Sequence, residues 1–249
     1  GGTVSMSYFG AITQAANAPM VIVSGGHATG TIIFQTGILS ATNGTGLQFD
    51  NADGTYNFNG TNTMSGGDAG IDILNGSAGS FTFSNNTSIT NPSGTAFNLN
   101  GSNASVTYSG SISDNTGLVV NIDNHDAGTM TFQNGNITST GTGISVANCS
   151  AGTVNFNNPA INLNTGTSAA VTLNTNTGST INFTPSAGNG LDIVTTSGAG
   201  FNATGGATAI NVTGSGNTIT STTGTALNVV STTIGAGNLN FQSISSNGS

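Results

Sequence analysis

The apolar residues of this chain form short groups, separated by Gly, Asn, Ser and Thr, that recur at a nearly constant interval. One group has the form apolar–x–aromatic and occupies residues 32–34, 56–58, 81–83, 106–108, 130–132, 154–156 and 181–183. Its aromatic residue returns about every two dozen positions, and residues 239–241 repeat the motif near the end. A fixed period of this size indicates a repeat architecture.

Two further apolar groups keep step with the first. The second lies at residues 47–49, 71–73, 97–99, 120–122, 144–146, 171–173, 191–193, 210–212 and 227–229. The third is a single isoleucine, at Ile38, Ile89, Ile112, Ile137 and Ile161. From residue 171 on, the interval between members of the second group shortens at every step, and residues 201–203 and Ile219 replace the aromatic group. We therefore expect shorter turns and a thinner rod in this part.

Each group alternates apolar and polar residues over a few positions, which is the period of a half-buried β-strand. The abundant Gly, Asn, Ser and Thr disfavour helix interiors. If each strand pairs in parallel with its equivalent one repeat later, the apolar residues stack inside a solenoid. The sequence thus predicts an all-β fold, a right-handed parallel β-helix of about ten coils of three short strands.

The repeat also predicts how the chain is divided. We expect residues 1–29 to form an irregular N-terminal cap or an incoming coil, and residues 30–249 to form one β-helix domain. The pattern begins and ends without an evident polar cap, which solenoids need for solubility. We therefore expect the domain to be part of a longer chain, or a subunit whose ends are covered by partners.

Asparagines follow the second apolar group at one constant offset. They are Asn51, Asn75, Asn124 and Asn148, with Gly101 in the intervening slot. Asn tolerates left-handed backbone angles, as Gly does. We expect these residues to stack at a tight corner and to form an amide ladder there, although chance remains an alternative in a chain so rich in Asn.

Composition narrows the classes of partner. The chain carries eight Asp and no Glu, Lys or Arg, so its net charge is −8. Without cationic side chains it has nothing to neutralise phosphates with, which argues against nucleic-acid binding and against anionic lipid surfaces. No apolar run is long enough to span a bilayer, so we expect no direct membrane insertion. Disorder is an alternative on composition alone, but disordered segments have no reason to place Phe at a fixed interval.

The three-group repeat resembles the pectate-lyase-like superfamily of parallel β-helices, and within it the surface-exposed and autotransported repeat proteins of bacteria. Residues 83–86 (Phe-Ser-Asn-Asn) match the Phe-x-x-Asn motif of polymorphic outer-membrane proteins, and residues 205–208 (Gly-Gly-Ala-Thr) half-match their Gly-Gly-Ala-Ile motif. The resemblance implies an extracellular or cell-surface solenoid. The family's catalytic residues do not carry over: pectate lyases use an Arg base, and polygalacturonases use close Asp with a basic pair, whereas this chain has no cationic residue.

Four aspartates stand at one predicted corner. Asp50 and Asp53 fall three repeats before Asp123 and Asp126, at the same offset, and oxygen-rich corners of this kind can hold calcium. Solvated loop acids are the alternative. We expect His125, in the same segment, on the surface, where it would be able to join a metal site. The single cysteine, Cys149, allows no intrachain disulfide and is expected to be an inert small side chain.

Three functions fit these features. We favour an extracellular, non-catalytic structural or adhesive β-helix, part of a cell-surface appendage, fibre or adhesin stalk, that self-associates or binds a cell-surface or glycan receptor. A carbohydrate-active enzyme is the first alternative, although glycoside hydrolysis needs two facing carboxylates. An ice-binding solenoid is the second. It needs one hydroxyl column in every turn, but the column of Thr131 mixes Thr with Asn and one Ile: Ile33, Asn57, Thr82, Thr107, Asn155 and Asn182.

Overall fold

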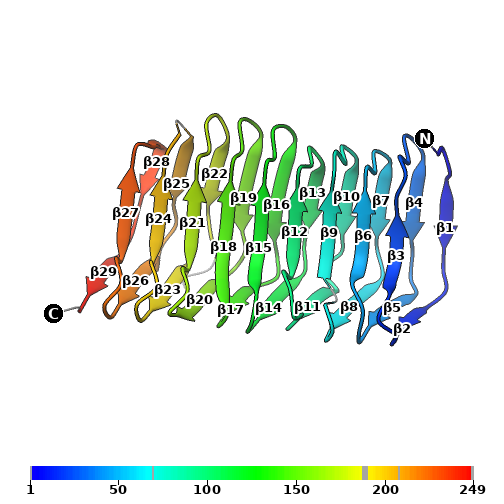
Figure 1. Cartoon of the computed structure of the whole chain (residues 1–249), viewed down its shortest axis with the longest axis horizontal. Helices are drawn as coiled ribbons and strands as arrows, with labels where there is room; N and C mark the ends of the chain where they lie inside the picture. Colours follow the sequence, from blue (N-terminus) through cyan, green and yellow to red (C-terminus); the bar gives the residue numbers. More distant parts are fainter. Residues whose placement is uncertain (1, 69, 187–189, 207, 248–249) are drawn as a thin grey trace.

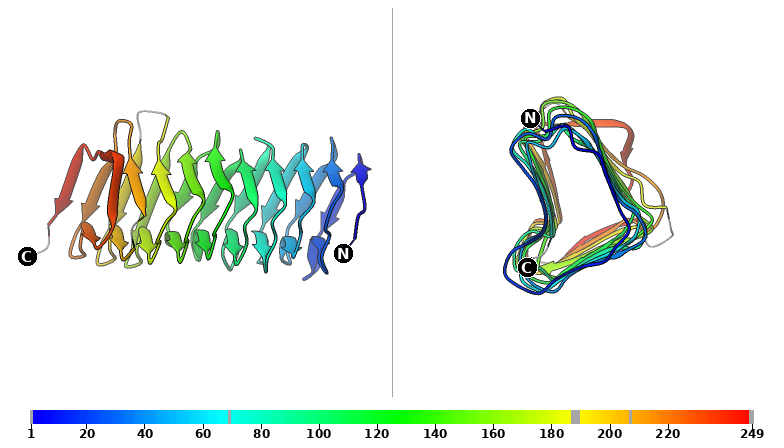
Figure 2. Two further views of the ribbon diagram at one scale, coloured as in Figure 1. Left: turned by 90° about the horizontal axis from the view of Figure 1, so that it is seen from above. Right: turned by 90° about the vertical axis from the view of Figure 1, so that its right-hand side faces the viewer.

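A computed structural model describes residues 2–68, 70–186, 190–206 and 208–247. These residues contain 29 β-strands and no helix, and the strands form three parallel sheets wound into one rod (Figure 1). Seen end-on, successive coils overlie one another and enclose a three-sided core (Figure 2). The prediction of an all-β parallel solenoid with three strands per coil is confirmed. Residue 207, within the Gly-Gly-Ala-Thr half-motif, lies outside the described residues.

Each sheet collects every third strand. The first sheet contains β1 (Met6–Tyr8), β4 (Thr31–Phe34), β7 (Thr55–Phe58), β10 (Ser80–Phe83), β13 (Ser105–Tyr108), β16 (Thr129–Gln133), β19 (Thr153–Asn157), β22 (Thr180–Phe183), β25 (Ala209–Val212) and β28 (Thr233–Leu239). The second contains β2 (Ile12–Gln14), β5 (Ile38–Ala41), β8 (Thr61–Ser65), β11 (Thr87–Thr90), β14 (Ser111–Asp114), β17 (Ile137–Ser139), β20 (Ile161–Gly166), β23 (Leu191–Thr195), β26 (Thr218–Ser221) and β29 (Ser243–Ser246). The third contains β3 (Pro19–Val23), β6 (Gly46–Asp50), β9 (Gly70–Leu74), β12 (Phe97–Asn100), β15 (Leu118–Asp123), β18 (Thr142–Ala147), β21 (Val171–Asn174), β24 (Phe201–Thr204) and β27 (Leu227–Val230).

The strand register places equivalent aromatic residues directly over one another. Phe58 pairs with Phe83, and Phe132 pairs with Phe156, which pairs in turn with Phe183. The stacked Phe132 and Phe156 rings are 5.1 Å apart with planes inclined by 7°. These side chains are fully buried, and an aromatic pair adds about 0.5–1.5 kcal/mol beyond the area that it buries. The interior is therefore a continuous ladder of rings and aliphatic side chains.

The C-terminal coils are not shorter than the preceding ones, so the expected thinning of the rod is wrong. Residues 191–193 belong to β23 of the second sheet, and residues 210–212 to β25 of the first. The true successor of β21 in the third sheet is β24, so Val171 pairs with Phe201 and not with residue 191. β22 ends at Phe183 and β23 begins at Leu191, whereas one coil earlier β19 ends at Asn157 and β20 begins at Ile161, so these two strands are farther apart in the sequence. Apolar groups alone do not reveal which sheet they join.

Two smaller assignments also change. Ile38 is 55% exposed, because Leu39 is the residue of β5 that points inward. The inward column of the third group runs through Met64, Ile89, Ile112, Ile137, Ile161 and Leu191. Near the end, Leu239 rather than Phe241 stands opposite Val212, because a register shift in the pairing of β25 with β28 moves the aromatic beyond the strand.

The corner asparagines have the predicted left-handed backbone angles, but their side chains form no ladder. Asn51, Asn75, Asn124 and Asn148 have φ between 49° and 56° and Gly101 has φ 60°, in the left-handed region. The column is held by backbone bonds between coils, such as Asn75 N to Asn100 O at 3.1 Å. The four side chains are exposed, and none donates to another. Only Asn148 reaches a neighbouring coil, where Nδ2 donates to Asp123 Oδ1 at 2.7 Å.

Candidate functional site

The outer surface of the first sheet is the most regular surface of the rod. Its first outward column is hydroxylic in seven successive coils: Thr31, Thr55, Ser80, Ser105, Thr129, Thr153 and Thr180. The second column begins at Ile33 and then passes through Asn57, Thr82, Thr107, Thr131, Asn155, Asn182 and Asn211. A third, at the ends of the strands or just beyond them, contains Gln35, Asn59, Ser84, Ser109, Gln133, Asn157 and Thr184. We call these three columns the first-sheet face.

Side-chain amides along this face are tied into a ladder with one direction. Asn182 Nδ2 donates to Asn155 Oδ1 and Asn211 Nδ2 donates to Asn182 Oδ1, both at 2.8 Å. Asn155 Nδ2 lies 3.5 Å from Thr131 Oγ1. Every amide therefore donates toward the N-terminal coil, and each ladder amide retains one N–H and one carbonyl lone pair that the ladder does not use. The amide ladder predicted for the corner occurs here instead, in the middle of a sheet.

No aspartate lies in the three columns of the first-sheet face, although Asp53 and Asp126 stand in corners that join the third sheet to the first. Asp72 points outward from the third sheet and Asp192 from the second. The other six are in or beside the corners that border the third sheet: Asp50, Asp53, Asp68, Asp114, Asp123 and Asp126. Because the chain has no cation, the first-sheet face is a neutral surface on a strongly anionic rod.

The four aspartates of the predicted calcium site form two separate pairs. Asp50 and Asp123 occupy the same corner column three coils apart, a separation of roughly 14 Å at the strand spacing of a β-sheet. Asp53 Oδ1 accepts from Ala78 N at 2.9 Å, and Asp126 Oδ1 accepts from Ser150 N at 2.8 Å. No group of three metal-ligating acids, histidines or cysteines occurs in the described ranges. Calcium binding by either pair stays a prediction.

Hydrogen bonds from Ser150 change the pKa of Asp126. Ser150 Oγ donates to Asp126 Oδ1 at 2.6 Å, and this bond, followed by the Ser150 backbone N–H, lowers the pKa of the Asp126 carboxyl. Both bonds join one coil to the next. The carboxylate therefore acts as an acceptor that fastens adjacent corners.

His125 is buried, which corrects the expectation of a surface histidine. Its side chain is fully inaccessible, and Nδ1–H donates to Ser102 O at 2.7 Å. Burial lowers the pKa of His125, although Ser102 and Asp126 oppose this shift, and Nε2 has no hydrogen-bond partner among the described residues. Its neighbours Asn124 and Asp126 are more exposed. The run looks like a polar loop in sequence, but its middle residue turns into the core.

Cys149 occupies the equivalent inward position one coil later. The side chain is fully buried, and its Sγ lies 3.2 Å from Ala147 O. Burial raises the pKa of this thiol to about 11, so it is protonated at neutral pH. A protonated, inaccessible thiol is a poor nucleophile and metal ligand.

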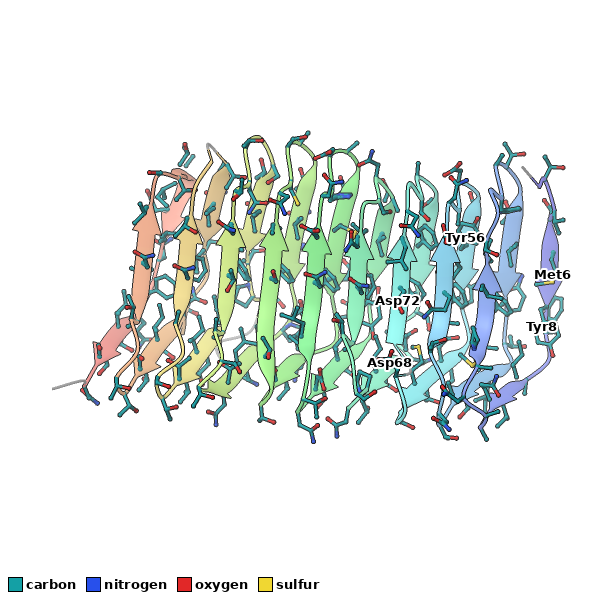
Figure 3. The ribbon with its side chains drawn as sticks, in the orientation of Figure 1. Met6, Tyr8, Tyr56, Asp68 and Asp72 are labelled. Carbon is teal, nitrogen blue, oxygen red and sulfur yellow. The ribbon has the colours of Figure 1, made fainter. Side chains whose placement is uncertain are left out.

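Asp68 and Asp72 are two acids close enough for the charge of one to act on the other. Figure 3 shows both on the coil that contains β9. Burial raises the pKa of Asp72, the donors Asn98 and Gln48 oppose this, and the charge of Asp68 raises it further. Asn98 Nδ2 donates to Asp72 Oδ1 at 2.8 Å and Gln48 Nε2 donates to Oδ2. Both carboxylate oxygens are thus engaged by the neighbouring coils.

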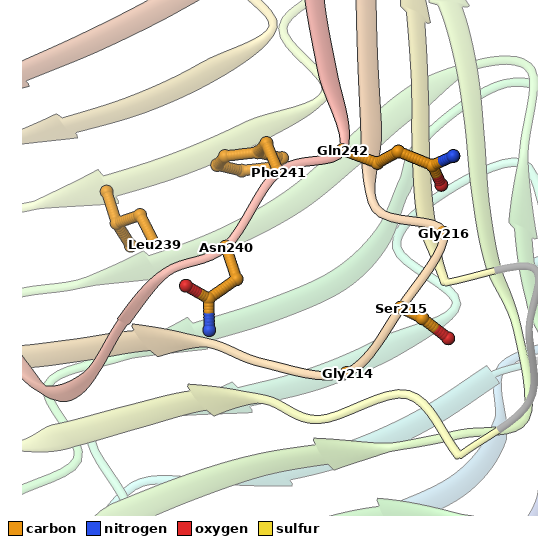
Figure 4. A pocket seen from close by; sticks show the side chains of 7 residues that line it. All are labelled: Gly214, Ser215, Gly216, Leu239, Asn240, Phe241 and Gln242. Carbon is orange, nitrogen blue, oxygen red and sulfur yellow. The ribbon is translucent and has the colours of Figure 1, made fainter.

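Two hollows of the surface lie on the last coils. One is lined by residues 214–216 and 239–242 (Figure 4). A second is lined by residues 223–227, Ile244 and Ser246. The residues that line them include no acid, histidine or cysteine. No helix of the described chain is long and apolar enough to cross a membrane.

Comparison with known proteins assigns neither a family nor a function to this chain. No family model, no curated protein and no solved structure matches the chain.

Proposed function

We propose that this chain is an extracellular, non-catalytic β-solenoid that forms part of a cell-surface appendage, fibre or adhesin stalk. The observation that carries the proposal is the first-sheet face, an uncharged surface of hydroxyl and amide groups that runs along a rod. Such a surface offers many weak hydrogen bonds in a fixed array, which suits repeated contact with a neutral partner better than turnover of a substrate. The resemblance to surface-exposed repeat proteins of the pectate-lyase-like superfamily is consistent with this role.

The rod also suits display. Parallel pairing between coils satisfies the backbone hydrogen bonds, and each coil contacts only its neighbours, so length is gained by adding coils. The chain has no Lys or Arg, and proteases that cleave after these residues have no site in it. Both properties favour a spacer exposed to an extracellular environment.

Immunoelectron microscopy of source cells tests the proposal. An antibody against this chain is expected to label the outer surface or a filament that extends from it. Label confined to the cytoplasm would contradict the proposal. Turnover of an acidic polysaccharide by the purified chain, abolished by Asp72→Asn, would contradict its non-catalytic part and favour the carbohydrate-active alternative.

Ice binding is a second candidate, because one column of the first-sheet face is unbroken. Sequence analysis considered the column of Thr131, but the neighbouring column from Thr31 to Thr180 is Thr or Ser in seven successive coils. In three of these coils, both columns are hydroxylic. Thermal hysteresis at micromolar protein, lost when Thr107 is replaced by Lys, is the result expected of an ice-binding face.

A further inference from the structure

We propose that two copies of this chain pair side by side through the first-sheet face, with their rods antiparallel. This inference rests on the proposed structural function and names the partner that the face accepts. The partner is a second copy of the chain. Charge, area and the direction of the amide ladder each support it.

Charge selects the face. Each copy carries a net charge of −8 with no cation to offset it, so two copies repel wherever their aspartates meet. Like charges juxtaposed across an interface cost several kcal/mol. The strands of the third sheet carry Asp50, Asp72 and Asp123, those of the second sheet carry Asp114 and Asp192, and those of the first sheet carry none; Asp68 lies in a corner between the second and third sheets, and Asp53 and Asp126 lie in corners between the third and first sheets. Of the three sheets, the first is therefore the one on which two copies can meet without a carboxylate on the facing strands.

The area is sufficient for a specific interface. The first-sheet face spans the eight strands from β4 to β25, and at the strand spacing of a β-sheet it is about 34 Å long. Three outward columns with their side chains give a width of about 20 Å, so the face covers roughly 680 Å², within the range of about 600–1,000 Å² that standard interfaces bury on each partner. A typical stable interface buries about 800 Å² on each partner. The end-on view shows that successive coils overlie one another (Figure 2), so the face is straight along the rod.

The ladder amides make the face self-complementary and set the orientation. Asn155, Asn182 and Asn211 each retain one donor and one acceptor, so a copy of the face can both give and receive hydrogen bonds. The ladder dipoles all point the same way along the rod. A two-fold axis that lies in the interface, perpendicular to both rods and near β13, places the ladder of β19 to β25 opposite the N-terminal coils of the other copy, whereas a parallel pairing would set the two ladders side by side with their dipoles pointing the same way, which is repulsive. The same axis makes the contact isologous.

Aromatic residues help to exclude a sugar polymer as the occupant. None of the large aromatic side chains of β4 to β22 in the first sheet points outward, because those rings are in the core. A neutral polysaccharide would therefore find hydrogen bonds but no stacking platform. A second copy needs only hydrogen-bonding groups in register.

Sedimentation velocity of the whole chain, from micromolar to millimolar concentration, tests the pairing. We expect a monomer–dimer equilibrium in which Thr107→Asp weakens the dimer by at least about tenfold, because two added carboxylates meet near the centre of the face. Thr138→Asp is the matched control: Thr138 also points outward from mid-strand, on the second sheet, and the substitution adds the same charge. It should leave the dimerisation constant unchanged.

Cysteine cross-linking tests the orientation. With a short bismaleimide, Thr107→Cys should link to its own copy because β13 lies next to the middle of the sheet, whereas Thr180→Cys, on β22, should not. The native Cys149 is buried, and the unmodified chain serves as the blank. Linking at Thr180→Cys would overturn the antiparallel arrangement.

Three outcomes would overturn the pairing itself. They are a chain that is monomeric throughout, a dimer that responds equally to Thr107→Asp and Thr138→Asp, and a monomer that shows thermal hysteresis. Association through the edge strands of the end coils would give the second outcome. A monomer that is still found on the cell surface would overturn the pairing and leave the proposed function intact.

Discussion

The first and third sheets share one construction on the inside and differ on the outside. In both, inward positions hold buried Phe, Ile, Leu and Val in every central coil. Outside, the first sheet shows Thr, Ser and Asn, whereas the middle column of the third sheet holds Gln48, Asp72, Asn98 and Asn121. The core tolerates only residues that stack on the coils above and below. The exterior is free to diverge, so each outer face can acquire its own chemistry without changing the fold.

The interior should be equally sensitive under both sheets. Phe132→Ala in the first sheet is expected to lower the free energy of unfolding by about 3–5 kcal/mol, and Leu99→Ala in the third by about 2–5 kcal/mol, because each leaves a cavity. Thr131→Ala, one residue away on the outer face, should change it by less than about 0.5 kcal/mol. Urea unfolding measures all three. Comparable losses for Thr131→Ala and Phe132→Ala would contradict the assignment of inside and outside.

On the outer face of the third sheet, Asp72 is the most sensitive position. Asp72→Ala removes the acceptor for Asn98 Nδ2 and Gln48 Nε2, and donors left unsatisfied in a partly buried place cost about 1–3 kcal/mol. Asp72→Asn keeps an acceptor and should cost less. If the alanine variant is as stable as the wild type in urea, the acceptor role is wrong.

Acid should destabilise the corner between the third and first sheets. Burial lowers the pKa of His125 in the folded chain, so the unfolded chain binds the proton more readily, and stability falls as the pH drops below about 6.5. The slope reaches at most about 1.4 kcal/mol per pH unit for one group. His125→Gln should flatten this slope between pH 7 and pH 5. An unchanged slope in equilibrium unfolding would place the sensitivity elsewhere.

The smallest effect is expected on the first-sheet face. Asn182→Ala breaks the amide ladder at its centre, and because the freed groups reach water, the loss should be about 0.5–1.5 kcal/mol. Asn228→Ala provides the comparison on the third sheet, where Asn228 Nδ2 donates to Asn202 Oδ1 at 2.7 Å. It removes one ladder bond instead of two and should cost less. Urea unfolding of both variants decides whether the longer ladder adds stability.

Sequence reasoning identified the coil through its aromatic residues but failed where the coil length changes. Phe58, Phe83, Phe132 and Phe156 follow one nearly constant interval, and parallel pairing of short strands is the arrangement that buries all of them. After Ile161 the corners vary in length, and an apolar–x–apolar group looks the same in any of the three sheets. The sheet that a strand joins is decided by its pairing with a strand of the preceding coil. This pairing is a contact between residues that are far apart in the sequence.

In the candidate site, too, the local features could be predicted from the sequence and the contacts between coils could not. The residue types of the first-sheet face can be read from the sequence. The unbroken column from Thr31 to Thr180 cannot, because its members lie outside the apolar–x–aromatic groups and are aligned only by the strand register. The four asparagines at the corner predicted left-handed angles correctly, since Asn and Gly share that preference. The same asparagine pattern did not predict where the amide ladder forms, because the position of the ladder depends on which side chains are held on a strand.

The sequence alone determined that the chain is an anionic, cation-free solenoid with three apolar groups per coil, because strand period, repeat length and composition are local properties. The tertiary structure decided that His125 and Cys149 lie in the core, that Asp50 and Asp123 stand three coils apart, and that one face is free of charge. These facts arise from stacking, which brings together residues some two dozen positions apart and turns alternate corner residues inward.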